Sequence, residues 1–69
     1  MTVIQITVNG STRALAGSLD VAALLATLQL AGKKVAVERN GEIVPKGRYA
    51  ATAVAASDRI EIVAAVGGG

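Results

Sequence analysis

The sequence contains neither cysteine nor histidine. Without cysteine, the chain can form no disulfide, no thiolate zinc site and no cysteine nucleophile. Without histidine, it also lacks the commonest general base and the commonest nitrogen ligand for metals. These two absences argue against a self-contained enzyme, so we expect no catalytic residue, no metal and no cofactor bound by this chain.

Aromatic residues and clustered charge are also scarce. Tyr49 is the single aromatic residue, and seven basic against five acidic residues leave a formal net charge of +2. Binding to nucleic acid favours a basic stripe interleaved with aromatic residues, and neither is visible. No apolar run is long enough to cross a bilayer, and the first residues lack the pattern of a secretory signal. We therefore expect a cytoplasmic protein that binds neither nucleic acid nor membrane.

Apolar residues are plentiful, at 52% of the 69 residues, which argues against intrinsic disorder. The length suffices for one small domain, and such a domain hides only about 60% of its unfolded surface, so its stability should be modest. We expect one folded domain over residues 1–66, followed by a glycine tail over residues 67–69.

Two dipeptides, Asn9-Gly10 and Asn40-Gly41, each separate two segments with strand-like residues. Asparagine and glycine both tolerate the positive φ that tight hairpin turns demand. The sequence therefore predicts two hairpins, with strands over residues 3–8 and 11–15, and over residues 35–39 and 42–44. A bulge at Gly10 would shift the register of the first hairpin. A last strand is expected over residues 59–62, where apolar and polar residues alternate.

One helix is expected over residues 21–30, with Asp20 as its N-cap and Gly32 as its C-terminal stop. Its apolar positions recur at helical spacing and comprise Val21, Leu24, Leu25 and Leu28. Lys33 and Lys34 would then lie near the negative end of the helix dipole, which is a sufficient structural reason for them. Residues 46–56 are alanine-rich with weak periodicity and are expected to connect the strands through a short helical turn.

The order β-β-α-β-β-β in so short a chain fits an α+β fold of the β-grasp, or ubiquitin-like, type. We expect a mixed five-stranded sheet with one main helix across one face, and the last strand inserted centrally, parallel to the first. The core is expected to contain Ile4, Ile6, Leu24, Leu25, Leu28, Val37 and Ile60. Tyr49 is expected to close the edge of this core.

The sheet face away from the helix should carry apolar residues among charged ones. Strand alternation places Ile43, Val63 and Ala65 there, and we interpret these three as a patch for partner docking. Ordinary exposure of scattered apolar residues explains them equally well. Arg39 and Glu42 flank the second turn and are expected to pair across the strands.

The terminal run Gly67-Gly68-Gly69 has no side chains, so it could thread a narrow channel and bring a carboxylate to a buried site. A carboxylate is a poor electrophile, so acyl chemistry there would need activation by a partner enzyme, for instance as an acyl-adenylate. The alternative is a frayed end, because disorder at termini is common.

Several segments, in this order, resemble the thiamine-biosynthesis sulfur carrier proteins, a ubiquitin-like β-grasp family. They are residues 6–10 (ITVNG), 20–25 (DVAALL), 35–45 (VAVERNGEIVP), 58–63 (DRIEIV) and Gly68-Gly69. Two departures are small: the approach to the helix at residues 18–20 is one residue longer, and Ser57-Asp58 replaces an acidic-Gly-Asp turn.

The resemblance implies a mechanism in which this chain is a carrier and not an enzyme. An adenylyltransferase of the ubiquitin-activating-like class would use ATP to adenylate the carboxylate of Gly69. Sulfur from a persulfide donor would displace AMP to leave a thiocarboxylate, which thiazole synthase would use as its sulfur source. Gly69 would carry the reactive group, while Gly68 and, less specifically, Gly67 would thread the tail into the partner.

Three other functions remain open at this point. The small subunit of molybdopterin synthase shares the roll and the diglycine tail, and would co-purify with its large subunit. A ubiquitin-like protein modifier would form conjugates of higher mass through isopeptide bonds. An interaction domain with an incidental tail is the fourth possibility. The segment at residues 35–45 resembles the thiamine carriers more than the other groups.

Overall fold

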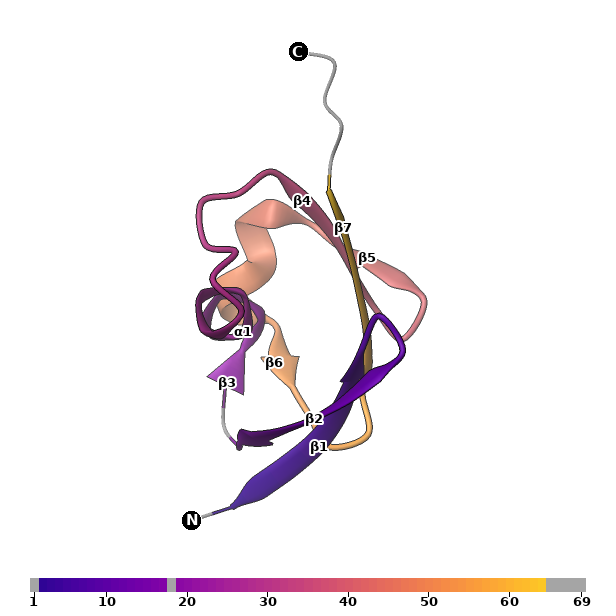
Figure 1. Cartoon of the computed structure of the whole chain (residues 1–69). Helices are drawn as coiled ribbons and strands as arrows, with labels where there is room; N and C mark the ends of the chain where they lie inside the picture. The colour runs from indigo at the N-terminus through magenta and orange to yellow at the C-terminus, as the bar shows by residue number, and fades with distance from the viewer. Residues whose placement is uncertain (1, 18, 65–69) are drawn as a thin grey trace.

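The computed structural model describes residues 2–17 and 19–64. A five-stranded sheet with the order β2-β1-β7-β4-β5 lies against one helix, α1, which covers one face of the sheet (Figure 1). The strands are β1 (Val3–Val8), β2 (Ser11–Ala16), β4 (Val35–Arg39), β5 (Glu42–Val44) and β7 (Arg59–Ala64). β7 is central, parallel to β1 and antiparallel to β4. The predicted β-grasp arrangement is therefore confirmed.

Both Asn-Gly dipeptides form the predicted two-residue hairpin turns. The φ angles are 51° at Asn9, 83° at Gly10, 53° at Asn40 and 87° at Gly41. Positive φ at both central residues defines a type I′ turn, whose twist matches that of the flanking strands. The pairing of β1 with β2 continues without interruption to the pair of Val8 with Ser11, so the bulge considered at Gly10 is absent.

The helix α1 (Val21–Thr27) begins where the sequence predicts, because the Asp20 side chain accepts a hydrogen bond of 2.8 Å from the Ala23 backbone N–H. Its predicted end at residue 30 is wrong. Gln29 adopts a φ of 61°, and the Leu30 N–H donates to the Leu25 carbonyl at 2.7 Å. This six-to-one bond is that of a Schellman motif, which ends the helix.

The early end of α1 also overturns the explanation of the lysine pair. Lys33 and Lys34 lie beyond the last turn of the helix, which contains no basic residue. The field of a helix dipole falls off within its last turn, so it does not account for these two lysines. Gly32 has a φ of 78°, but it belongs to the loop that follows the helix.

Three short elements join the helix layer to the sheet. β3 (Leu19–Asp20) and β6 (Ala53–Val54) form a separate two-stranded sheet, and η1 (Lys46–Ala51) is the expected helical turn, of the 3-10 type. The Val21 N–H donates to the Thr52 carbonyl at 2.9 Å, which fixes the start of α1 to this segment. Strands of two residues are too short to show a periodicity, so the sequence does not predict β3 and β6.

The core lies between α1 and the sheet. Its buried members are Ile6, Val8, Val21, Leu24, Leu25, Val37, Val44, Val54, Ile60 and Ile62. Five of the seven expected core residues are among them, whereas Ile4 and Leu28 are half-buried and pack against its edge. Tyr49 also packs there, as expected, and its hydroxyl donates to the Val35 carbonyl at 3.4 Å.

Truncating Leu25 should test this core. Leu25 is 4% exposed, so Leu25→Ala is expected to lower the free energy of unfolding by about 2–5 kcal/mol. Ile43→Ala is the matched control, because Ile43 is 65% exposed and its truncation should change stability by less than about 0.5 kcal/mol. Urea unfolding followed by circular dichroism measures both, and equal losses would contradict the assigned core.

Candidate functional site

The face of the sheet opposite α1 is uncovered in the described part of the chain (Figure 1). Val63 is 61% exposed and Ile43 65% exposed, as expected for this face. Ala36 lies opposite Val63 in the pairing of β4 with β7, and Glu38 lies opposite both Ile43 and Glu61. We call these five residues the open-face patch. Ala65, the third residue expected there, lies outside the described residues.

The patch combines exposed apolar side chains with two carboxylates on neighbouring strands. Glu38 and Glu61 face each other directly in the register of β4 and β7. Like charges directly opposite are destabilising in a sheet, which disfavours this arrangement in the free protein. A partner that offers cationic donors beside an apolar surface would relieve the repulsion and cover Val63 at the same time.

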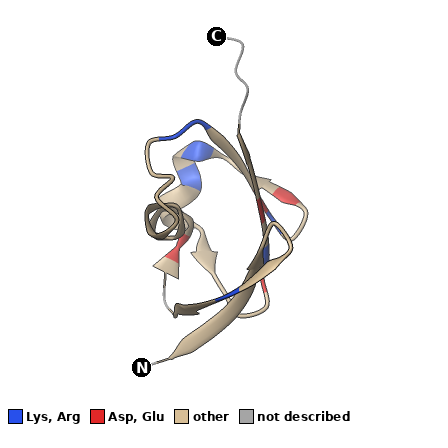
Figure 2. Cartoon of the chain, viewed as in Figure 1, with Lys and Arg blue, Asp and Glu red and all other residues tan. Residues whose placement is uncertain are grey.

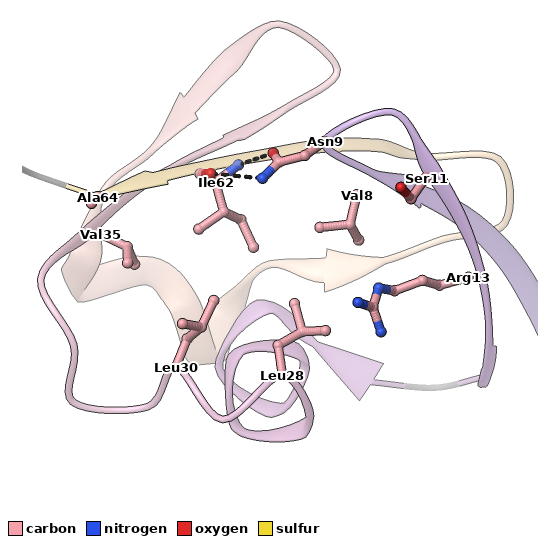
Figure 3. Close-up of a pocket in the computed structure, with 9 residues that line it drawn as sticks. All are labelled: Val8, Asn9, Ser11, Arg13, Leu28, Leu30, Val35, Ile62 and Ala64. Carbon is pink, nitrogen blue, oxygen red and sulfur yellow. Dashed lines mark hydrogen bonds between the residues drawn. The ribbon is translucent and has the colours of Figure 1, made fainter.

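The central strand β7 is held at its C-terminal half by the side chain of Asn9. The Asn9 Nδ2 donates to the Ile62 carbonyl at 2.9 Å, and the Ile62 N–H donates to the Asn9 Oδ1 at 2.7 Å (Figure 3). The β1 strand ends at Val8, and the Asn9 backbone N–H still donates to the Ile60 carbonyl at 2.9 Å. The side-chain amide of Asn9 then continues the pairing with β7 as one more residue of β1 would. This pairing holds β7 in place at Ile62, two residues before Ala64, which is the last described residue.

Asn40 holds the other end of β7. The Arg59 N–H donates to the Asn40 Oδ1 at 2.8 Å, and the Asn40 N–H donates to the Arg59 carbonyl at 2.8 Å. Both turn asparagines therefore bind β7 in addition to adopting positive φ. Sequence reasoning explained these residues by their turns alone and missed the second role, because their partners lie 53 and 19 positions away in the sequence.

Asp58, at the entry to β7, is a buried carboxylate with a complete set of donors. It is 6% exposed and accepts hydrogen bonds from the Arg39 Nε at 2.7 Å, the Ala55 N–H at 2.8 Å and the Asn40 Nδ2 at 3.0 Å. Burial by itself raises the pKa of the Asp58 carboxyl. The bonds from Ala55, Asn40 and Arg39 outweigh burial, so its pKa lies below the usual value.

This cluster corrects the expected pairing of Arg39 with Glu42. The two residues lie opposite each other across the second hairpin, as predicted. The guanidinium of Arg39 nevertheless forms its ion pair with Asp58. Asp58 is buried and already positioned by two other donors, whereas Glu42 is exposed, and exposed ion pairs contribute little free energy.

A cavity of about 430 Å³ opens between the end of α1 and the sheet (Figure 3). Leu28, Leu30, Val35 and Ile62 form apolar walls, and Arg13 extends from β2 beside them. None of the described residues that line it is acidic, so it offers no carboxylate for acid–base chemistry. Within residues 2–17 and 19–64 there is also no cluster of side chains that could hold a metal ion.

The glycine tail is predicted from the sequence to carry the chemistry. Gly67, Gly68 and Gly69 lie outside the described residues, so the structure fixes only where the strand before them runs. Ala64 lies opposite Val35 at the end of β7.

Among the described helices, none has the length and apolar character needed to cross a membrane.

Residues 6–69 match the ThiS family, so the match includes the central strand β7 and all three terminal glycines. The chain belongs to the ThiS family. The solved structures agree: the crystal structure of the thiamine biosynthesis protein ThiS from Geobacter metallireducens superimposes with a TM-score of 0.83 at 36% identity. The match covers 96% of this chain and 100% of that one.

The relatives of this ThiS-family chain fall into two kinds. The sulfur carrier protein ThiS of Bacillus subtilis is 54% identical over 46 residues, which are 67% of this chain and 70% of that protein. The thiazole synthase of Paramagnetospirillum magneticum is 51% identical over 65 residues, which are 94% of this chain. The chain spans only 20% of that thiazole synthase, and the same share of the one from Magnetococcus marinus.

The Asp58 cluster gives a testable pH dependence of stability. Because the folded pKa of Asp58 lies below its unfolded value of about 3.9, its carboxylate stabilises the fold above that pH. This contribution is lost as the pH falls through the folded pKa. At pH 7, Asp58→Asn is expected to lower the free energy of unfolding by about 1–3 kcal/mol.

Urea unfolding at pH 7 and at about pH 2.5 measures the effect, and the difference between the wild type and Asp58→Asn should shrink in acid. Glu42→Gln is the control, because Glu42 is exposed and lies opposite Arg39 without its ion pair. An equal loss in Glu42→Gln would show that the pairing assigned to Arg39 is wrong.

Proposed function

We propose that this ThiS-family chain is a sulfur carrier of thiamine biosynthesis that carries sulfur on the carboxyl group of Gly69. The observation that carries the proposal is the family match through Gly69, on a β-grasp fold whose central strand leads toward the glycine tail. The likeness to the sulfur carrier protein of Bacillus subtilis supports the same function. It favours a carrier over a molybdopterin synthase subunit or a protein modifier.

The chemistry begins with activation, because a carboxylate does not accept a nucleophile readily. A carboxylate oxygen of Gly69 attacks the α-phosphorus of ATP in a partner enzyme, and pyrophosphate leaves. The terminal sulfur of a persulfide then attacks the acyl carbon of the adenylate, and AMP leaves. A thiol cleaves the resulting S–S bond, which forms a disulfide with the donor and releases the C-terminal thiocarboxylate.

In this scheme the chain is the substrate of its partners and not an enzyme. It binds no cofactor itself. ATP is bound and consumed by an adenylyltransferase of the ubiquitin-activating-like class, and the reaction takes place in the cytoplasm. Thiazole synthase is proposed as the acceptor of sulfur, and the segments of two thiazole synthases that match this chain support the pairing. The division into a folded domain over residues 1–66 and a tail over residues 67–69 follows from the same scheme.

We assign docking to the open-face patch. Ile43 and Val63 are the exposed large apolar side chains of the patch, and Ala65 would extend it along the chain toward Gly67. Burying such side chains against a partner contributes about 25 cal/mol for each Å² of apolar surface removed from water. A patch beside the end of β7 would also set the direction in which Gly68 and Gly69 enter the partner.

Shortening the tail tests the carrier function directly. One extended residue spans about 3.5 Å, and a misplacement of about 1 Å can lower a rate on the order of a hundredfold. Deletion of Gly69 should therefore abolish ATP–pyrophosphate exchange by the cognate adenylyltransferase. Gly68→Ala keeps the length but restricts φ, so it should slow exchange less severely.

Neither change is expected to remove a core contact, so thermal unfolding should give unchanged melting temperatures. Undiminished exchange by the chain without Gly69 would refute the carrier mechanism.

A charge in the open-face patch tests docking. Val63→Asp should weaken binding to the adenylyltransferase or to thiazole synthase on the order of tenfold or more, because it buries an unpaired carboxylate. Val3→Asp is the matched control, because the two side chains are equally exposed, at 62% for Val3 and 61% for Val63. Val3 is the first residue of β1 and lies far from the C-terminal end of β7. Isothermal titration calorimetry measures the affinities. Unchanged binding of Val63→Asp to both partners would reject the patch.

A further inference from the structure

Basic residues gather at one end of the molecule. Lys33 and Lys34 lie in the loop before β4, and Lys46 and Arg48 lie in η1; both segments appear in blue on the same side in Figure 2. Lys33, Lys34 and Lys46 line one hollow of about 290 Å³ together with Val35 and Tyr49. We call these three lysines the basic cluster.

Within residues 2–17 and 19–64, the fold gives the basic cluster no structural partner. The helix α1 ends at Thr27, so its dipole does not account for Lys33 and Lys34. Among the described residues, the single ion pair joins Arg39 to Asp58. All three lysines are exposed, and the described lining of their hollow contains no acidic residue. Three like charges on one surface repel one another, so the cluster costs free energy in the isolated protein.

The position of the basic cluster relates it to the tail. Val35, which lines the hollow, lies opposite Ala64 in the pairing of β4 with β7. The cluster therefore borders the last described residue of the central strand. The open-face patch, with Glu38 and Glu61, lies on the uncovered sheet face. A partner that contacts both surfaces meets opposite charges at two defined places, which fixes the orientation of the carrier.

We propose that the basic cluster binds an acidic surface of the adenylating partner beside the entry point of the tail. The inference rests on the proposed function, since it deepens the description of that same partner. Complementary charges raise the rate of encounter and select the orientation of docking more than they raise final affinity. Lysine suits this role, because its ammonium group is a compact, hydrated charge on a flexible stem.

An acidic protein surface fits the cluster better than a nucleic acid does. Binding of single strands favours exposed aromatic rings on which bases stack. Tyr49 is the only aromatic residue of the chain; it packs against the core, and its hydroxyl is bonded to the Val35 carbonyl. A net charge of +2 also gives little long-range attraction for a polyanion.

Single charge reversals in the basic cluster test the proposal. The rate of ATP–pyrophosphate exchange by the purified cognate adenylyltransferase is measured against carrier concentration, for the wild type, Lys33→Glu, Lys34→Glu and Lys46→Glu. At low salt, each variant should raise the KM for the carrier on the order of fivefold to tenfold, with kcat unchanged. At about 0.5 M salt, screening should remove most of the difference.

Arg13→Glu is the matched control, because it makes the same change of charge at an exposed residue of β2, outside the basic cluster. Its KM for the carrier should change less than twofold. An equal increase of this KM in Arg13→Glu would overturn the proposal, because the KM would then depend on the net charge of the carrier and not on the basic cluster. An increased KM for ATP with an unchanged KM for the carrier would overturn it in favour of nucleotide binding.

The outcomes for the wild type separate this inference from the proposed function. If the wild-type chain supports no exchange, the carrier function fails and this inference fails with it. If the wild type is active and the lysine variants keep its KM and its salt dependence, the basic cluster alone is refuted. Thermal unfolding of each variant confirms that the fold is intact.

Discussion

The attachment of β7 to both hairpins is the constraint on which the rest of the structure depends. This strand comes last along the chain, yet it occupies the middle of the sheet and contributes Ile60 and Ile62 to the core. Its parallel pairing with β1 is short, because only Thr7 and Val8 of β1 have partners in β7. The Asn9 side chain extends this short ladder, and Asn40 anchors the opposite edge, so the strand is fixed from both sides.

The arrangement explains how a small domain can present a chain end for chemistry elsewhere. A segment that is to be bound by another protein needs a fixed direction at its base, and β7 supplies one through bonds to both hairpins. The apolar residues of the open face and the basic cluster lie on different sides of the C-terminal end of β7. In the proposed function, recognition would therefore use the folded domain, while the chemistry would use a segment without side chains.

The sequence predicted most of the sheet and the position of the helix, because alternation in β1, β4 and β7 and the stripe of α1 are strong periodic signals. It also predicted the exposure of Ile43 and Val63, whose role in docking stays a prediction. It failed at the end of α1, because a left-handed Gln29 has no signature comparable to that of glycine. The two-residue strands β3 and β6 are set by tertiary contacts and show no local pattern.

The bonds around Asp58 were missed for a different reason. They join side chains to groups that are distant along the sequence, such as Arg39 and Asn40 to Asp58, and no local pattern encodes such a meeting. A buried aspartate at the start of a strand is visible only once the fold is known. The same holds for the bonds of the turn asparagines to β7, which depend on which strand becomes the neighbour of each hairpin.

The use of Asn-Gly at both turns has a consequence for the chemical ageing of the protein. Asparagine is a thermolabile residue, because its amide can hydrolyse to a carboxylate. At Asn9 that change would replace the Nδ2 donor by an oxygen facing the Ile62 carbonyl, and at Asn40 it would place a second carboxylate against Asp58. Each hydrolysis would thus place two hydrogen-bond acceptors next to each other beside the central strand, where a donor and an acceptor are now paired. The lifetime of the fold is thereby linked to the survival of two amide groups.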